Sequence, residues 1–185
     1  QMVSQEGVNT HVFAIEGNFD DAQTGVKKIF ADEDFGTQLK AKGIKLSSAN
    51  SINIGRLVPQ VAYYVYSYVK LVESGVLEVG RPMNVVVPTG NFGNILAAYM
   101  AGEMGVNIGK LICASNENNV LTDFLRTGTY DARRAFHLTN SPSMDILVSS
   151  NLERLLYLLS GRNGGAVSQW MKKLDEEKSY DVTPE

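Results

Sequence analysis

The sequence is poor in the residues that build disulfide bonds and most metal sites. Among its 185 residues are one cysteine, Cys113, and two histidines, His11 and His137. A single cysteine cannot form a disulfide within the chain, which favours a reducing compartment, and we therefore expect a cytoplasmic protein. No group of His, Cys and Asp residues has the spacing of a zinc site, so the sequence predicts no metal centre.

Long apolar stretches and an excess of one charge are also missing. No apolar run approaches the length that is needed to span a bilayer. The 17 basic and 20 acidic residues give a net charge of −3, without large clusters of either sign. We therefore expect no membrane and no nucleic acid as a partner, because such surfaces need clustered Lys and Arg. With 44% hydrophobic and 20% charged residues, the composition is that of a globular protein.

What the sequence does contain is an alternation of short β-branched runs with longer amphipathic stretches. Predicted strands lie at residues 12–15, 44–47, 85–87 and 111–115. Predicted helices lie at residues 22–31, 34–42, 54–73, 95–104, 119–128, 152–159 and 166–178. This order predicts an α/β fold with a parallel-type sheet and flanking helices. Ligands of such folds bind in loops at the carboxyl ends of strands, here after residues 15, 46 and 87.

The loop at residues 88–94, Pro-Thr-Gly-Asn-Phe-Gly-Asn, follows the clearest predicted strand and precedes a helix. Gly90 and Gly93 allow the backbone to approach a ligand closely. The first amides of the helix have no partner within it and lie at the positive end of its dipole, so they can bind a phosphate. The loop is neither a Walker loop nor a dinucleotide fingerprint. On spacing alone, a phosphate cradle and an ordinary tight turn are equally good interpretations.

A second polar loop, Asn-Ser-Ile-Asn-Ile-Gly-Arg at residues 50–56, opens the longest predicted helix. Arg56 falls in the first helical turn, where a cation opposes the helix dipole. Its fork of N–H donors suits a phosphate, which would explain this position. A surface arginine next to a capping Asn explains it equally well. A third segment, Asn18–Asp21, places two acids at a helix start, which is typical of a dipole complement rather than of a metal site.

Three motifs, in this order, resemble the microbial branch of the threonine synthase family. They are Glu-Gly-Asn-Phe-Asp-Asp at residues 16–21, the polar loop at residues 50–56 and the glycine-containing loop at residues 88–94. Residues 114–118 and 143–154 resemble that family as well. The resemblance covers roughly residues 11–162.

The resemblance implies a fold type II enzyme that depends on pyridoxal 5′-phosphate (PLP). Such an enzyme, a carbon–oxygen lyase, converts O-phosphohomoserine and water to L-threonine and phosphate in threonine biosynthesis. It implies that the phosphate of PLP is held, largely by backbone amides, at Gly90, Asn91, Phe92, Gly93 and Asn94. It implies that the phosphate of the substrate is held at Asn50, Ser51, Asn53 and Arg56.

The sequence departs from the family pattern because it has no Phe-Lys-Asp motif, which in the family carries the Schiff-base lysine. We therefore assign no catalytic residue to this chain and expect an inactive fragment of threonine synthase. Residues 1–46 are expected to be the last βα portion of the small domain, and residues 47–185 the core of the large, cofactor-phosphate-binding domain. A truncated sheet leaves apolar surface uncovered, so self-association is a further expectation.

Two other functions are open at this point. One is a stand-alone module that binds a phosphate ligand without catalysis. The other is a different fold type II enzyme, such as a dehydratase of hydroxy amino acids. That enzyme would share the cofactor cradle but would have no need of the phosphate site at residues 50–56.

Overall fold

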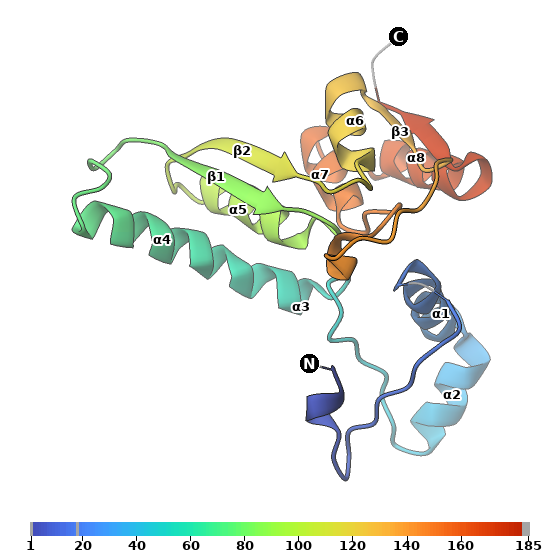
Figure 1. The fold of residues 1–185 in the computed structure, drawn as a ribbon. Coiled ribbons are helices and arrows are strands. Elements are labelled where there is room, and N and C mark those ends of the chain that lie inside the picture. The colour runs from blue at the N-terminus through green and yellow to red at the C-terminus, as the bar shows by residue number, and fades with distance from the viewer. Residues whose placement is uncertain (1, 18, 183–185) are drawn as a thin grey trace. The chain divides into compact units, whose positions relative to one another are not determined.

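The computed structural model describes residues 2–17 and 19–182 and divides the chain into two compact units, Gln1–Leu46 and Ser47–Glu185. The first unit is helical (Figure 1), with a short 3-10 helix η1 (Met2–Gln5), α1 (Phe19–Ala31) and α2 (Glu33–Ala41). Helix α2 begins where it does because the Asp32 carboxylate accepts a hydrogen bond from the Phe35 amide at 2.8 Å. Both helices predicted in this unit are confirmed.

The two strands predicted at residues 12–15 and 44–47 are wrong. Both segments are irregular, and 86% of the Phe13 surface is exposed. A strand is stabilised by hydrogen bonds to a neighbouring strand, and among the described residues no strand pairs with either segment. Of the βα portion predicted for residues 1–46, the helical part is therefore confirmed and the strand is wrong. The assignment of the two units to a small and a large domain of an enzyme stays a prediction, and Asn18 lies outside the described residues.

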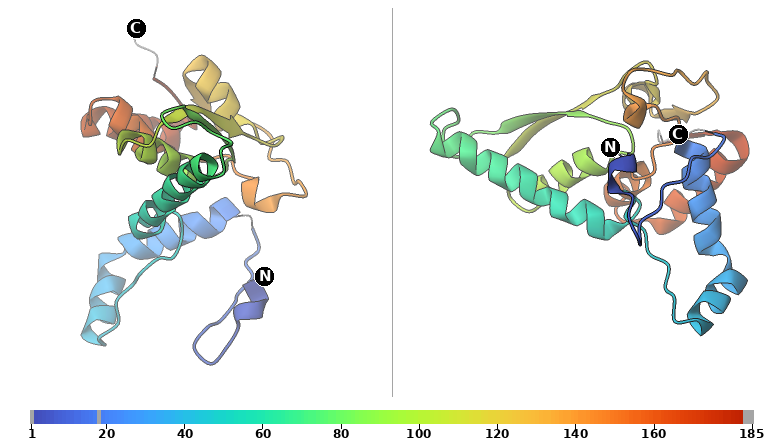
Figure 2. Two further views of the ribbon diagram at one scale, coloured as in Figure 1. Left: turned by 90° about the vertical axis from the view of Figure 1, so that its left-hand side faces the viewer. Right: turned by 60° about the horizontal axis from the view of Figure 1, so that its bottom comes forward.

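The second unit is built around a parallel pair of strands, β1 (Met83–Pro88) and β2 (Ile108–Ala114), which α5 (Gly93–Glu103) connects. Helix α5 lies against this pair of strands. Its small residues, such as Ala97 and Ala101, are fully buried. Val87 points into the same core. The opposite side of the pair is open, because Val86 and its register partner Ile112 remain 61% and 44% exposed. These elements confirm the predicted α/β arrangement (Figures 1 and 2).

The long helix predicted at residues 54–73 is present in three pieces. They are α3 (Ile54–Leu57), a 3-10 turn η2 (Val58–Gln60) and α4 (Val61–Glu73). Pro59 causes the interruption, because it has no N–H with which to continue the α-helical ladder. Val58 keeps right-handed helical dihedral angles, at φ −56° and ψ −43°, so the chain runs on into α4. Helix α4 packs against α5 through residues such as Tyr64, whereas Tyr66 is exposed.

The C-terminal part of the unit contains a second, antiparallel pair of strands that the sequence analysis missed. The elements of this C-terminal part are α6 (Val120–Thr127), β3 (Thr129–Asp131), η3 (Pro142–Met144), α7 (Leu152–Leu159), α8 (Gly164–Glu177) and β4 (Ser179–Asp181). Strands β3 and β4 pair with Tyr130 opposite Tyr180. The two rings stack with centroids 5.2 Å apart, and Phe124 meets both edge-on. The predicted helices in this region are confirmed.

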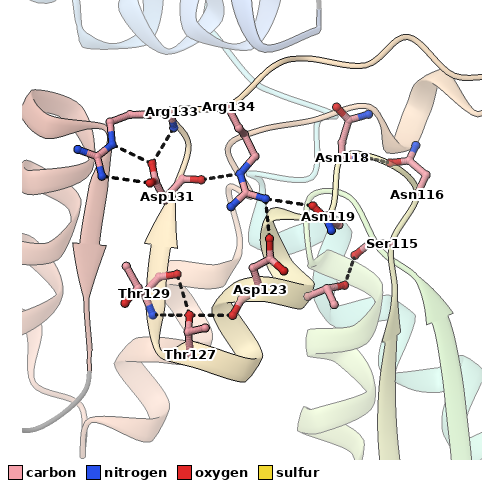
Figure 3. A network of polar contacts seen from close by, with 11 residues as sticks. Ser115, Asn116, Asn118, Asn119, Asp123, Thr127, Thr129, Asp131, Arg133 and Arg134 are labelled. Carbon is pink, nitrogen blue, oxygen red and sulfur yellow. Dashed lines mark hydrogen bonds and ion pairs between the residues drawn. The ribbon is translucent and has the colours of Figure 1, made fainter.

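Polar contacts fix the loop that follows β3. Arg134 donates to the Asp131 carbonyl, to the Asn119 side chain and, at 2.8 Å, to the Asp123 carboxylate (Figure 3). Arg133 forks onto the Asp131 carboxylate at 2.9 and 3.0 Å and lowers the pKa of that carboxyl to about 2. Arg134 therefore ties α6 and β3 together at the surface. No helix in the described residues has the length and apolar character of a bilayer span.

Candidate functional site

The glycine-containing loop begins directly at the carboxyl end of β1. The Thr89 amide donates to the Ala114 carbonyl at 2.8 Å, and the Thr89 hydroxyl donates to the Val87 carbonyl at 2.7 Å. Phe92 is buried with φ at +64°, a left-handed conformation that turns the chain into α5 at Gly93. Among the described residues, no side chain caps this helix start, because the N-cap residue Phe92 has no acceptor atom in its side chain. The first amides of α5 are therefore available to an external acceptor, as a phosphate cradle requires.

The two glycines of the loop lie against other backbone and side chains. A Cβ atom at Gly90 would come within 3.2 Å of the Ser143 carbonyl oxygen, which is closer than nine in ten real Cβ contacts. A Cβ atom at Gly93 would lie 3.5 Å from the Asn151 amide nitrogen and 3.9 Å from the Ser51 Cβ. The cradle is thus a tight space that a side chain would fill. Ser51, from the other predicted phosphate loop, lies beside it.

Three consecutive residues, Ser149, Ser150 and Asn151, support the glycine-containing loop from behind. The Ser149 hydroxyl donates to the Gly90 carbonyl at 2.8 Å, and the Ser150 hydroxyl donates to the Asn91 side chain at 3.2 Å. Asn151 donates to the Asn91 carbonyl twice, through its side chain at 2.8 Å and its backbone amide at 3.1 Å. Asn151 is fully buried. The carbonyl oxygens of Gly90 and Asn91 are therefore occupied.

The loop at residues 50–56 is held in shape by its own side chains. The Asn50 carbonyl oxygen Oδ1 accepts from the Ser51 hydroxyl and from the Ile52 amide, both at 3.1 Å. Asn53 caps α3 by accepting from the Gly55 amide at 2.8 Å, which is the capping alternative that the sequence left open for this loop. Arg56 is exposed and donates to the Ala49 carbonyl at 2.8 Å. Among the described residues, no carboxylate lies within ion-pair distance of Arg56.

The side chain of Asn94 is hydrogen-bonded within the protein and does not face a ligand as a binding group. Its Oδ1 accepts from the Tyr64 hydroxyl at 2.6 Å, and its Nδ2 donates to the Gln60 Oε1 at 2.9 Å. Burial raises the pKa of Tyr64, so its hydroxyl keeps the proton that it donates. The side chain of Asn94 is thus occupied by α4 and η2. What remains for a phosphate is the Asn94 backbone amide.

A buried carboxylate fixes the segment that lies over Gly90. Asp145 accepts from the Thr139 amide and hydroxyl, both at 2.8 Å, and from the side-chain amides of Asn116 and Asn118 at 2.7 and 3.1 Å. These donors, the Thr139 backbone amide first, lower the pKa of Asp145. The ionised carboxylate therefore joins the loop after β2 to the segment that carries Ser143.

The described residues supply binding groups to this site and no obvious nucleophile. Burial raises the pKa of Cys113, beside Thr89, so its thiol is not an activated nucleophile. Among the described residues, the hydrogen bonds that shape the two loops involve no lysine. In the described part of the chain, no group of three or more His, Cys, Asp or Glu residues could hold a metal ion. The arrangement can bind and orient anionic groups.

The sequence analysis missed the supporting residues. Ser149, Ser150 and Asn151 fell inside a stretch that resembled the threonine synthase family, yet no role was assigned to them, and the same holds for Arg154. A run of three short polar residues just before a helix is a signal for hydrogen bonding to nearby backbone. That signal was present, but it could not show that the acceptors are at Gly90 and Asn91.

The fold places this chain within a structural class. A solved PLP-bound threonine synthase from Brucella melitensis superposes with a TM-score of 0.77 at 42% identity, over 95% of this chain and 35% of that one. The yeast threonine synthase structure gives a TM-score of 0.73 at 38% identity, over 90% of this chain and 33% of that one. The chain therefore has the architecture of part of a fold type II, PLP-dependent enzyme.

Curated sequences define the relationship more narrowly. Human threonine synthase-like 1 is 47% identical over 98% of this chain, and the threonine synthase of Pseudomonas aeruginosa is 46% identical over 91%. The matched segment is 25% of the human protein and 34% of the bacterial one, and no family model matches the chain. The chain is thus homologous to a segment of threonine synthases and spans between a quarter and two fifths of the length of such relatives.

Proposed function

We propose that this chain is the phosphate-binding portion of a threonine synthase. The glycine-containing loop, Gly90 to Asn94, would hold the phosphate of PLP through its backbone amides. The polar loop with Asn50, Ser51, Asn53 and Arg56 would hold the phosphate of O-phosphohomoserine. The observation that carries the proposal is the adjacency of the two loops, since a Cβ at Gly93 would lie only 3.9 Å from that of Ser51.

The residues present fit a bound PLP phosphate. Gly90 and Gly93 leave a space that a Cβ would fill, and Phe92, the N-cap residue of α5, makes no side-chain cap hydrogen bond. When bound, PLP would supply an electron sink for chemistry at the carbons of the substrate. The chain would contribute binding and orientation: amides of Gly93 and Asn94 to the cofactor, and the Arg56 guanidinium to the phosphate ester. We further propose that the 185 residues alone do not release phosphate from O-phosphohomoserine.

The compartment and the partner follow the same proposal. The proposed partner is O-phosphohomoserine, a small, free amino-acid phosphate. We also propose that the protein is located in the cytoplasm. The free, half-buried thiol of Cys113 supports a reducing compartment.

Isothermal titration calorimetry on the chain tests the binding roles separately. PLP should bind more tightly than pyridoxal, which lacks the phosphate, and O-phosphohomoserine more tightly than homoserine. Arg56→Ala should weaken O-phosphohomoserine binding about 10- to 150-fold, the range expected for a lost charge-assisted hydrogen bond. It should leave PLP binding unchanged, as should the control Arg126→Ala, an exposed arginine on α6.

The outcomes against the proposal are specific. Equal affinity for PLP and pyridoxal would contradict the cradle. Equal binding of O-phosphohomoserine by the wild type and Arg56→Ala would contradict the substrate site. A colorimetric phosphate assay with the purified chain, PLP and O-phosphohomoserine tests inactivity, and PLP-dependent phosphate release would overturn it.

A further inference from the structure

Arg154, on the first turns of α7, connects the two loops. Its Nη2 donates to the Ile52 carbonyl at 2.6 Å, and its Nη1 donates to the Asn151 side-chain oxygen. Asn151 in turn donates to the Asn91 carbonyl. The chain of bonds from Ile52 through Arg154 and Asn151 to Asn91 therefore joins the polar loop to the glycine-containing loop.

The charge of Arg154 is not neutralised within this network. Both of its acceptors are neutral amide oxygens, and the side chain is only partly exposed. Among the residues that the structure describes, no carboxylate comes within ion-pair distance of it. A half-buried cation without a counter-ion raises the local positive potential, which favours anions at the neighbouring loops.

A second connection between the two loops runs through Gln60 of η2. Gln60 donates to the Arg56 carbonyl at 3.0 Å and accepts from the Asn94 side chain at 2.9 Å. The helix start that carries Arg56 is thereby tied to the start of α5. Because two separate sets of hydrogen bonds join the two loops, a displacement of one loop strains the other.

We propose that Arg154 is a positioning residue that fixes the spacing of the two phosphate sites, so that they respond to ligands as one unit. This inference rests on the proposed function. A substrate that is held by its phosphate at one loop must present its reacting carbons to a cofactor held at the other, and a misplacement of about 1 Å costs on the order of 100-fold in rate. Arginine suits this role because its planar fork can hold two acceptors in a fixed geometry, whereas lysine is a flexible point charge.

Amide exchange measured by NMR on the ligand-free chain tests the positioning directly. Arg154→Ala and Arg154→Lys should both speed exchange of the hydrogen-bonded Asn53 and Arg56 amides by about 3- to 10-fold, as loss of one network hydrogen bond allows. The Tyr130 amide in the β3–β4 pair reports whether the rest of the unit stays folded. Arg126→Lys and Arg126→Ala are the matched controls.

A PLP titration of the same samples provides a second readout that a purely structural role would not change. In the wild type, PLP should shift the amide signals of both loops. In Arg154→Lys it should shift only those of the glycine-containing loop, with unchanged Tyr130 signals. Wild-type exchange rates in Arg154→Lys, or equal acceleration in the Arg126 variants, would overturn the positioning role. If PLP shifts no signal in the wild type, the proposed function is wrong, and the exchange rates alone still decide the role of Arg154.

Discussion

The tight contact at Gly90 gives a prediction whose size can be worked out from the structure. In Gly90→Ala the new methyl group would lie 3.2 Å from the Ser143 carbonyl oxygen and 3.5 Å from the Met144 Cα. Neither Gly90 nor the Ser143 segment can move easily. The Gly90 carbonyl accepts a hydrogen bond from Ser149, and the Ser143 segment is held in place by the hydrogen bonds of Asp145. Relief therefore requires movement of backbone rather than rotation of a flexible side chain.

The expected cost combines two opposing effects. Overpacking of this kind costs about 1–3 kcal/mol, and the entropy that alanine removes from the unfolded chain returns about 0.4–1 kcal/mol. The free energy of unfolding should therefore fall by up to about 2.6 kcal/mol, with a central value of about 1.3 kcal/mol, which lowers the melting temperature by about 3–5 °C for a protein of this size. Fluorescence of Trp170, which lies in α8 within the second unit, follows the unfolding of this unit.

Gly102→Ala is the matched control for this measurement. Gly102 lies within α5, and an added Cβ would meet Ile108 at an ordinary 3.6 Å. Alanine is the better helix former by about 1 kcal/mol, so the control should melt at or above the wild-type temperature. If Gly90→Ala also melts at or above that temperature, the Ser143 segment yields without cost and the cradle is not sterically closed.

Three further predictions concern the framework around the site. Tyr180→Ala should lower the free energy of unfolding in urea by about 3–5 kcal/mol, whereas the exposed Tyr157→Ala should change it little, and equal effects would contradict the aromatic core. Because hydrogen bonds lower the pKa of Asp145, its ionised carboxylate stabilises the fold fully above the ordinary Asp pKa of about 3.9, and this stabilisation is lost as pH falls through the lower, folded-state pKa. In acid titrations of stability, the wild type should lose this contribution and Asp145→Asn should not, so parallel curves would refute the role of the carboxylate. The open face at Val86 and Ile112 should drive self-association, measured by light scattering after size exclusion, and Val86→Lys should weaken it; a monomer at all concentrations would contradict this.

The central strand-loop-helix unit was predictable because its local signals agree with one another. The β-branched run at residues 85–87 and the small, apolar residues of α5 each prefer the structure that they adopt. Gly90 and Gly93 marked the loop between them, and Asn53 marked a helix start. At these positions the sequence pattern and the tertiary contacts favour the same conformation.

The failures occurred where the outcome depends on distant residues. The run at residues 12–15 has a strand-like sequence, but within the described part of the chain no neighbouring strand supplies hydrogen bonds to it. Conversely, Tyr180 lies in a polar segment that pairs with Tyr130 and so becomes a strand. The contacts of Arg154 and Asn151 with the two loops join residues that are 60 or more positions apart, and no local pattern indicates which acceptors they find.

The stacking of Tyr130 on Tyr180 also sets the order in which the site can be completed during synthesis. Tyr130 donates to the Leu147 carbonyl and accepts from the Ser149 amide, and Ser149 holds Gly90. The residue that covers Tyr130 is therefore translated some 90 positions after the loop that it helps to support. At 5–20 residues per second, the loop would wait about 5–18 s for its last support, a period in which a nascent chain depends on protection from aggregation.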